Sequence, residues 1–190
     1  MQSGVARPAT HARPDGDGPA PVKVHPGDPL YNEVLDFLNE EAEMLDDDRL
    51  VDWLAMLAED VSYLMPVRVT RQRGEGSGFA PGATFFDDDK TRLTFRVRRI
   101  VESPNAHAER PATRTRRLVT NVRIRRAGAD LLAQSSLLLL RSRWDQSDFD
   151  LLSARRNDLL RRVGADLKLV RREILVDQTV PESLCLTVFL

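Results

Sequence analysis

The chain has 190 residues, of which 42% are hydrophobic and 30% are charged, a composition typical of a soluble globular protein with one core. The longest strongly apolar run, residues 137–140, is far too short to cross a membrane, and the N-terminus lacks the apolar core of a signal peptide. We therefore expect a cytoplasmic protein without a membrane partner. The single cysteine, Cys185, excludes an internal disulfide, and its apolar neighbours predict a buried side chain without a redox role.

Charge is distributed unevenly, although the formal net charge is only -1. Between Asp28 and Pro66 there are twelve Asp or Glu residues against one Arg, whereas residues 92–172 hold twenty Arg or Lys residues against eight Asp or Glu. These opposite charges either pair within one molecule or form charge-complementary contacts between subunits. The basic residues alternate with core residues and lack interleaved aromatic side chains, which argues against a nucleic-acid partner.

The first 27 residues are predicted to be a flexible tail. They hold five prolines and four glycines and almost no side chain that a core would bury, so ordering them would lose entropy without a compensating gain. The alternative is an arm that becomes ordered on a neighbouring subunit, for which Val22, Val24 and His25 are the suitable residues.

Two helices are predicted next. Apolar residues recur every three or four positions over residues 31–45, which predicts a helix with one core-facing stripe that starts at Asp28. A second helix is predicted to start near Arg49. The carboxylates of residues 46–48 are expected to accept its free amide hydrogens.

The rest of the chain is predicted to form a sheet. Beyond residue 60 the apolar period changes to two, which places four residues on one side of a first strand: Val61, Tyr63, Met65 and Val67. A turn-rich stretch follows, and then five extended segments are expected: residues 92–102, 114–126, 130–143, 148–156 and 167–177. The segments favour an antiparallel meander. Helices followed by strands predict a single α+β domain over residues 28–190.

Alternation within these segments indicates one apolar face. In the segment 92–102, Leu93, Phe95 and Val97 are expected on that face, and in the segment 114–126 Leu118 is expected there, with Arg117 on the opposite face. The stretch 136–140 is apolar on both faces. We therefore expect helices to cover one face of this strand, and a second subunit or a curled sheet edge to cover the other.

Two motifs of the turn-rich region resemble binding sites but do not predict one. The glycines of residues 74, 76 and 78 lack the strand and helix of a dinucleotide fingerprint, so we expect a mobile loop. The aspartates of residues 87–89 lack the alternating spacing, glycine and distal Glu of a calcium loop, so we expect a turn or helix start.

Six segments, in this order, resemble the small, or beta, subunit of bacterial aromatic-ring-hydroxylating dioxygenases: EAEMLD at 41–46, WLAMLAED at 53–60, YLMPVRVTR at 63–71, RTRRLVTNV at 114–122, ARRNDLLRR at 154–162 and LKLVRREILVD at 167–177. The resemblance covers residues 29–190. It implies a cystatin-like, nuclear-transport-factor-2-like cone, in which a strongly bent, mainly antiparallel sheet wraps N-terminal helices. It also implies a hexamer of three large and three small subunits for the catabolism of aromatic compounds.

The chemistry of that family needs a Rieske [2Fe-2S] cluster, held by two Cys and two His, and a mononuclear iron, held by two His and a carboxylate. This chain has one cysteine and three histidines, and His11 and His25 lie in the predicted tail. His107 is then the only histidine expected in the folded part, so neither metal centre can be built here. We expect no catalytic residue, cofactor or metal ligand on this chain, and we expect both iron centres on a large, or alpha, partner subunit.

Eight residues that match the family's motifs are our candidates for subunit contacts or structural roles: Trp53, Asp60, Tyr63, Arg155, Arg156, Asp158, Arg171 and Arg172. The arginines offer forked hydrogen bonds, which serve equally well at an interface and in an ion-pair network within the chain. The interpretation that follows is a structural, assembly subunit.

Two rival hypotheses remain. Cone folds include dehydratases and isomerases that use Asp, Tyr and His in an apolar cavity, and Asp60, Tyr63 and His107 are the residues that would serve here. Asp60 and Tyr63 also have structural interpretations, as a helix-end acceptor and a core aromatic. The other rival is a homo-oligomeric scaffold that binds a small molecule without a large partner.

Overall fold

The computed structural model describes residues 20–72, 74–102, 113–142, 147–179 and 188–190. Seven strands form one sheet in the order β1-β4-β5-β6-β7-β2-β3. All neighbours are antiparallel except β2 and β7, which are parallel. The bounds are β1 Val22–Val24, β2 Leu57–Arg68, β3 Phe79–Asp89, β4 Arg114–Ala127, β5 Asp130–Ser142, β6 Phe149–Val163 and β7 Asp166–Val176.

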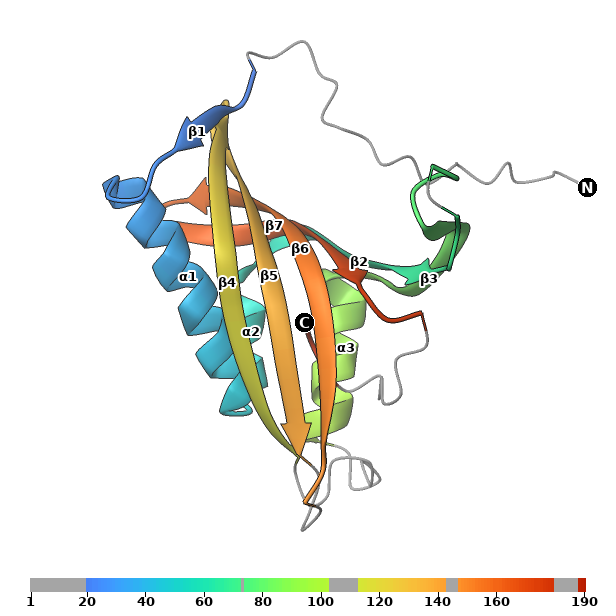
Figure 1. Ribbon diagram of the computed structural model, residues 1–190. Coiled ribbons are helices and arrows are strands. Elements are labelled where there is room, and N and C mark those ends of the chain that lie inside the picture. The colour runs from blue at the N-terminus through green and yellow to red at the C-terminus, as the bar shows by residue number, and fades with distance from the viewer. Residues whose placement is uncertain (1–19, 73, 103–112, 143–146, 180–187) are drawn as a thin grey trace, which may run out of the picture.

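Three helices lie on one side of this bent sheet, behind strands β4, β5 and β6 in Figure 1. They are α1 Pro29–Asp46, α2 Leu50–Ala55 and α3 Lys90–Val101. The predicted α+β class, the antiparallel meander from β4 to β7 and the cone-like wrapping of helices by the sheet are confirmed. The sheet stays open, with β1 and β3 at its edges.

The helical hairpin forms as predicted. Asp28 caps α1, because its carboxylate accepts a 2.9 Å hydrogen bond from the amide of Leu30. The buried stripe of α1 comprises Val34, Phe37, Leu38, Glu41, Ala42 and Leu45. Five of these six side chains are apolar, so Glu41 stands out as a charged residue inside the core.

The expectation that Asp46 caps α2 was wrong, because its carboxylate bonds to the sheet. Residue Arg49 is the N-cap of α2, and it makes no side-chain capping hydrogen bond. The Asp46 carboxylate accepts hydrogen bonds from the Thr115 hydroxyl, at 3.0 Å, and from the Arg117 amide, at 2.8 Å. It also pairs with the Arg117 guanidinium. Asp46 therefore ties the C-terminal end of α1 to β4.

The segment 92–102 was expected to be a strand and is helix α3 instead. Leu93, Phe95 and Val97 fit a period of two, but Leu93 and Val97 are also four residues apart and share one helical face. These two are buried, whereas Phe95 is 68% exposed. Asp89 starts the helix by accepting a 2.8 Å hydrogen bond from the amide of Arg92.

Because of a bulge in β4, the side chains in the first half of this strand point to the opposite face of the sheet from the one predicted. Asn121 has a left-handed φ of 54°, and the pairing of β4 with β5 shifts between Thr120 and Arg123. Alternation is therefore interrupted, so Arg117 points inward and is buried, while Leu118 points outward and is 44% exposed. The prediction for both residues was wrong because it assumed an uninterrupted strand.

Other boundaries differ from those predicted. β3 begins at Phe79, inside residues 74–82, which were expected to form a turn-rich stretch. β6 continues beyond residue 156 to Val163, because Leu160 packs in the core. The predicted tail over residues 1–27 contains β1, whose Val24 is buried and pairs with Ile124 of β4. Residues 1–19 lie outside the described part of the chain.

Candidate functional site

The interior of the cone holds a group of charged residues, which we call the buried charge cluster: Glu41 of α1, Arg156 and Asp158 of β6, and Arg172 of β7. Strand register brings the β6 and β7 members together, because Asp158 lies directly opposite Arg172. Glu41, Arg156 and Arg172 are fully buried, and Asp158 is only 3% exposed. Buried charges are tolerated when each is paired and hydrogen-bonded.

Arg172 is the centre of the buried charge cluster because its guanidinium binds two carboxylates at once. Its Nε and Nη2 donate to the two oxygens of Asp158, both at 2.8 Å. Its Nη1 and Nη2 donate to the two oxygens of Glu41, at 2.6 and 2.7 Å. Burial opposes the charge of Arg172, but the two carboxylates raise its pKa well above the ordinary value. Two forked, charge-assisted contacts fix the geometry of both partners.

Glu41 joins both helices to the sheet. Its oxygens also accept hydrogen bonds from the indole Nε1 of Trp53, at 3.1 Å, and from Nη1 of Arg156, at 3.2 Å. Burial by itself would raise the pKa of Glu41, but the positive charges of Arg172 and Arg156 lower it to about 2. Glu41 is therefore ionised under all ordinary conditions and does not serve as an acid or base near neutral pH.

The last described residues, Val188–Leu190, fill the space beside the buried charge cluster. The Tyr63 hydroxyl donates a 2.7 Å hydrogen bond to the Leu190 carbonyl and accepts one of 2.7 Å from the Leu190 amide. Nη1 of Arg172 donates to the same carbonyl at 3.0 Å, and Nη2 of Arg117 donates to the Phe189 carbonyl at 2.7 Å. The Phe189 ring packs 4.5 Å from that of Trp53, centroid to centroid. Among the described residues, backbone and side chains thus occupy the interior beside the buried charge cluster.

The structure brings five of the eight candidate residues together in or beside the buried charge cluster: Trp53, Tyr63, Arg156, Asp158 and Arg172. The other three lie elsewhere. Asp60 is exposed on β2 and accepts from Arg161 of β6, at 2.9 and 3.2 Å, while Arg155 and Arg171 are exposed on the outer face of the sheet. The structure contains one chain, so it does not test whether Asp60, Arg155 and Arg171 contact another subunit. Their interface role stays a prediction.

The proposed catalytic set of the dehydratase hypothesis does not assemble among the described residues. Tyr63 is fully buried and bonded to Leu190, whereas Asp60 is exposed and paired with Arg161. Burial raises the pKa of Tyr63 above its ordinary value, which makes the phenol a poorer acid. His107 lies outside the described part of the chain.

Sequence reasoning missed Glu41 and Arg117 as buried charged residues. For Glu41 a signal existed, because its position follows Leu38 by three residues and precedes Leu45 by four, which places it on the buried stripe of α1. For Arg117 no signal existed, because its inward direction depends on the bulge at Asn121.

In the part of the chain that the structure describes, no three His, Cys, Asp or Glu side chains are grouped so that they would hold a metal ion. His25, which precedes α1, is the one histidine among these residues, and it is exposed. This donor set does not fit a Rieske cluster or a mononuclear iron. None of the described helices is long and apolar enough to span a bilayer.

Comparisons with solved structures agree with the fold. The chain superposes on a chain of a naphthalene 1,2-dioxygenase with indole bound in its active site, with a TM-score of 0.76, 24% sequence identity and 88% of each chain covered. It also superposes on the beta subunit of a benzoate 1,2-dioxygenase from Burkholderia mallei, with a TM-score of 0.60, 19% identity, and coverage of 77% of this chain and 89% of that one.

Sequence comparisons are more specific. The chain is 40% identical to the beta subunit of benzene 1,2-dioxygenase from Pseudomonas putida, over 85% of this chain and 87% of that subunit. It is 36% identical, with the same coverage, to the beta subunit of biphenyl 2,3-dioxygenase from Rhodococcus jostii. Residues 40–183 match the model of the ring hydroxylating beta subunit family. The motifs, the cone fold and these matches together show that the chain belongs to the family of beta subunits of aromatic-ring-hydroxylating dioxygenases.

Proposed function

We propose that this chain is the assembly subunit of an aromatic-ring-hydroxylating dioxygenase and that it performs no chemistry itself. The observation that carries the proposal is the filled interior. The place where a cone-fold enzyme would keep its pocket is occupied by the buried charge cluster and by Phe189 and Leu190, all ion-paired, hydrogen-bonded or packed.

The buried charge cluster suits an assembly role because it links distant parts of the fold. Glu41 of α1 bonds to Trp53 of α2, Arg156 of β6 and Arg172 of β7. Ion pairs of this kind add little net stability compared with an apolar core, but they specify one arrangement of the elements they join. A fixed arrangement of helices on the sheet presents a rigid outer surface to other subunits.

The complex that we propose contains a large, or alpha, subunit, which carries the Rieske [2Fe-2S] cluster and the mononuclear iron. We propose a hexamer of three large and three small subunits, located in the cytoplasm. Support comes from the family assignment and from the donor set of this chain, which fits neither iron centre. By analogy with the relatives that act on benzene and biphenyl, the substrate class is an apolar aromatic hydrocarbon, and its contacts lie on the large subunit.

Within the chain, we propose one folded domain over residues 28–190, to which β1 adds a short edge strand. Of the eight candidates, we propose that Asp60, Arg155 and Arg171 contact other subunits, because they are exposed, and that the five buried ones hold the fold.

Co-expression with the large ring-hydroxylating dioxygenase subunit of the same organism tests this proposal. We expect an iron-containing complex whose native mass corresponds to three copies of each subunit. Failure of the two chains to co-purify would contradict the proposal. A complex that holds the two subunits in equal numbers, but not three of each, would correct the proposed stoichiometry and leave the proposed function standing.

A further inference from the structure

The outer face of the sheet, which points away from the helices, carries arginines in two neighbouring rows. Register aligns Arg125, Leu132, Leu159 and Arg171 across strands β4 to β7 in one row, and Arg123, Gln134, Asn157 and Glu173 in the next. All of these residues except Leu159 line a hollow of about 350 Å³, together with Ala133 and Asp158. We call this site, defined by Arg123, Arg125 and Arg171 around Leu132 and Gln134, the arginine hollow.

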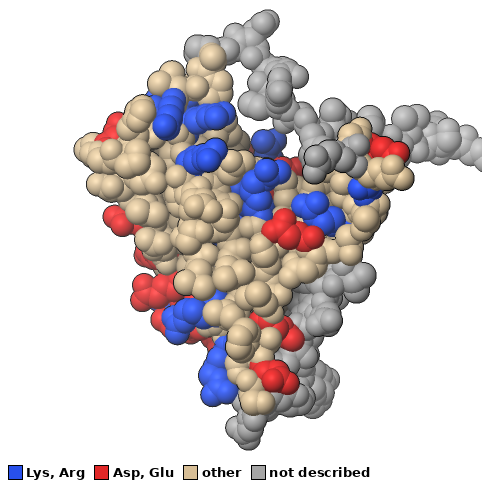
Figure 2. All heavy atoms as spheres, viewed as in Figure 1, with Lys and Arg blue, Asp and Glu red and all other residues tan. Residues whose placement is uncertain are grey.

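The three guanidiniums of the arginine hollow have no partner among the described residues, since each lacks both a hydrogen bond and an ion pair there. The amide side chains between them are already used, because Gln134 donates to Asn157 at 3.0 Å and Asn157 donates to Glu173 at 2.9 Å. Two carboxylates line the hollow, but Asp158 is bonded to the buried Arg172, so Glu173 alone faces three permanent positive charges. Figure 2 shows Lys and Arg side chains gathered on the upper part of this face, above a broad area of uncharged residues. Unpaired guanidiniums in a hollow favour carboxylate groups, which they bind through forked hydrogen bonds.

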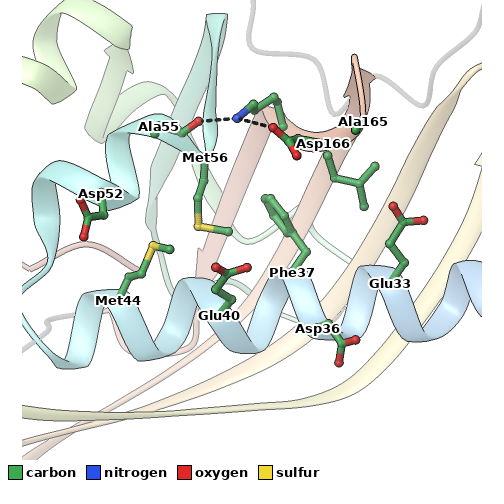
Figure 3. A pocket seen from close by; sticks show the side chains of 12 residues that line it. Glu33, Asp36, Phe37, Glu40, Met44, Asp52, Ala55, Met56, Ala165 and Asp166 are labelled. Atoms are coloured by element: carbon green, nitrogen blue, oxygen red, sulfur yellow. Dashed lines mark hydrogen bonds and ion pairs between the residues drawn. The ribbon is translucent and has the colours of Figure 1, made fainter.

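The opposite charge lies on the outward side of the helices. Asp36 and Glu40 share one stripe of α1, Asp47 is the C-cap that follows this helix, and Asp52 belongs to α2. No side-chain hydrogen bond or ion pair joins these four to other described residues. Glu40 and Asp52 line a groove of about 440 Å³ together with Phe37 and Met56. Figure 3 shows these side chains between α1 and α2. We call these four carboxylates the acidic ridge.

Stability of the isolated chain explains only Asp52, which lies in the first turn of α2, where a negative charge is favourable; it does not explain Asp36, Glu40 and Asp47. Asp36 and Glu40 are four residues apart on α1, where like charges repel each other. Asp47 follows the last turn of α1, which has no basic residue, so its charge opposes the helix dipole. A positive partner outside the chain would offset this repulsion.

We propose that the acidic ridge of one copy docks into the arginine hollow of a second copy. This inference rests on the proposed assembly function and names the surfaces that carry it. The helix surface is convex, and a hollow of about 350 Å³ has room for the carboxylate side chains that project from it. The two surfaces differ, so the contact is heterologous and each copy keeps one free surface of each kind until a ring closes. In a closed ring of three copies, every acidic ridge contacts the arginine hollow of a neighbouring copy.

Charge reversal on the full chain tests the contact. One variant carries Asp36→Arg with Glu40→Arg, a second carries Arg125→Glu with Arg171→Glu, and a third combines all four changes. We expect each of the first two to weaken self-association about tenfold or more, measured by sedimentation equilibrium, and the combined variant to recover it. Wild-type association should also weaken as salt rises, since exposed charges are screened.

The control reverses two exposed carboxylates away from the acidic ridge, Glu59→Arg and Glu75→Arg, and should associate as the wild type does. Circular dichroism verifies that every variant is folded. The proposal is overturned if wild-type chains stay monomeric at all accessible concentrations, if either reversed surface leaves association unchanged, or if the combined variant fails to recover.

The same variants, co-expressed with the large subunit, separate this inference from the proposed function. If the wild type does not retain the large subunit, the proposed function fails. If reversal of the arginine hollow releases the large subunit while small subunits still associate, the hollow faces that partner, and only the contact proposed between copies is overturned.

Discussion

Arg172 and Glu41 are 131 positions apart in the chain, yet they form two hydrogen bonds of 2.6 and 2.7 Å at the centre of the protein. The contact joins the C-terminal strand β7 to the first helix, and Trp53 and Asp158 complete it from α2 and β6. The fold is therefore closed by a polar contact between its two ends, surrounded by an apolar core.

Replacing Arg172 by Met should destabilise the protein by about 3–5 kcal/mol, because the change leaves Glu41 and Asp158 charged, buried and short of their main partner. Urea unfolding measures the effect. Arg99→Met is the control, since this arginine is exposed on α3 and lies outside both the buried charge cluster and the arginine hollow, and its change should stay within about 0.5 kcal/mol. Equal effects for the two variants would contradict the role given to Arg172.

Acid should weaken the fold through Glu41. Its pKa is about 2 in the folded protein against an ordinary value of 4.5. Because the folded value is the lower one, ionised Glu41 stabilises the fold fully above about pH 4.5, and this contribution, about 3 kcal/mol, is lost as the pH falls toward 2. The free energy of unfolding should fall less between these pH values in Glu41→Gln than in the wild type. Glu59→Gln, which changes a carboxylate that is 93% exposed and lies away from the acidic ridge, should retain the wild-type slope. An unchanged slope in Glu41→Gln would show that Glu41 is not the titrating group.

Truncating Phe189 to Ala should cost about 3–5 kcal/mol, because the ring is 1% exposed and packs against Trp53. Phe95→Ala makes the same chemical change on α3 at a position that is 68% exposed, and it should cost far less. Thermal unfolding distinguishes the two. A small effect at Phe189 would mean that the interior is not filled as described.

Tyr63→Phe and Asp60→Asn should leave the turnover rate of the assembled complex close to that of the wild type. Tyr63→Phe removes the hydroxyl that bonds to the amide and carbonyl of Leu190, so it should destabilise the small subunit by about 1–3 kcal/mol. Turnover per assembled complex, together with the yield of complex, measures both effects. Loss of turnover in fully assembled complex would instead support a catalytic role for these residues.

The sequence predicted the helical hairpin and the meander because local signals agreed with the fold: a cap at Asp28, one apolar stripe and regular alternation. It failed at α3, where a short amphipathic segment satisfies both periods and only the exposure of Phe95 distinguishes them. It also failed at Arg117, whose direction is set by one bulged residue that alternation does not reveal.

The buried charge cluster was predictable in part. Arg156, Asp158 and Arg172 were candidates because of their motifs, but their partner Glu41 was counted among the acidic residues of the first helix. A charged residue on an apolar stripe was the available signal. The contribution of Phe189 and Leu190 depends on long-range packing, and no local pattern in the sequence indicates it.

The most direct test of the central claim is oxygen consumption by the purified chain, supplied with ferrous iron, a reductant and benzene, beside the same assay on its complex with the large subunit. We predict that oxygen uptake and hydroxylated product stay at the level of a protein-free blank for the chain alone, and that both exceed this blank for the complex. Hydroxylated product from the chain alone would contradict the account.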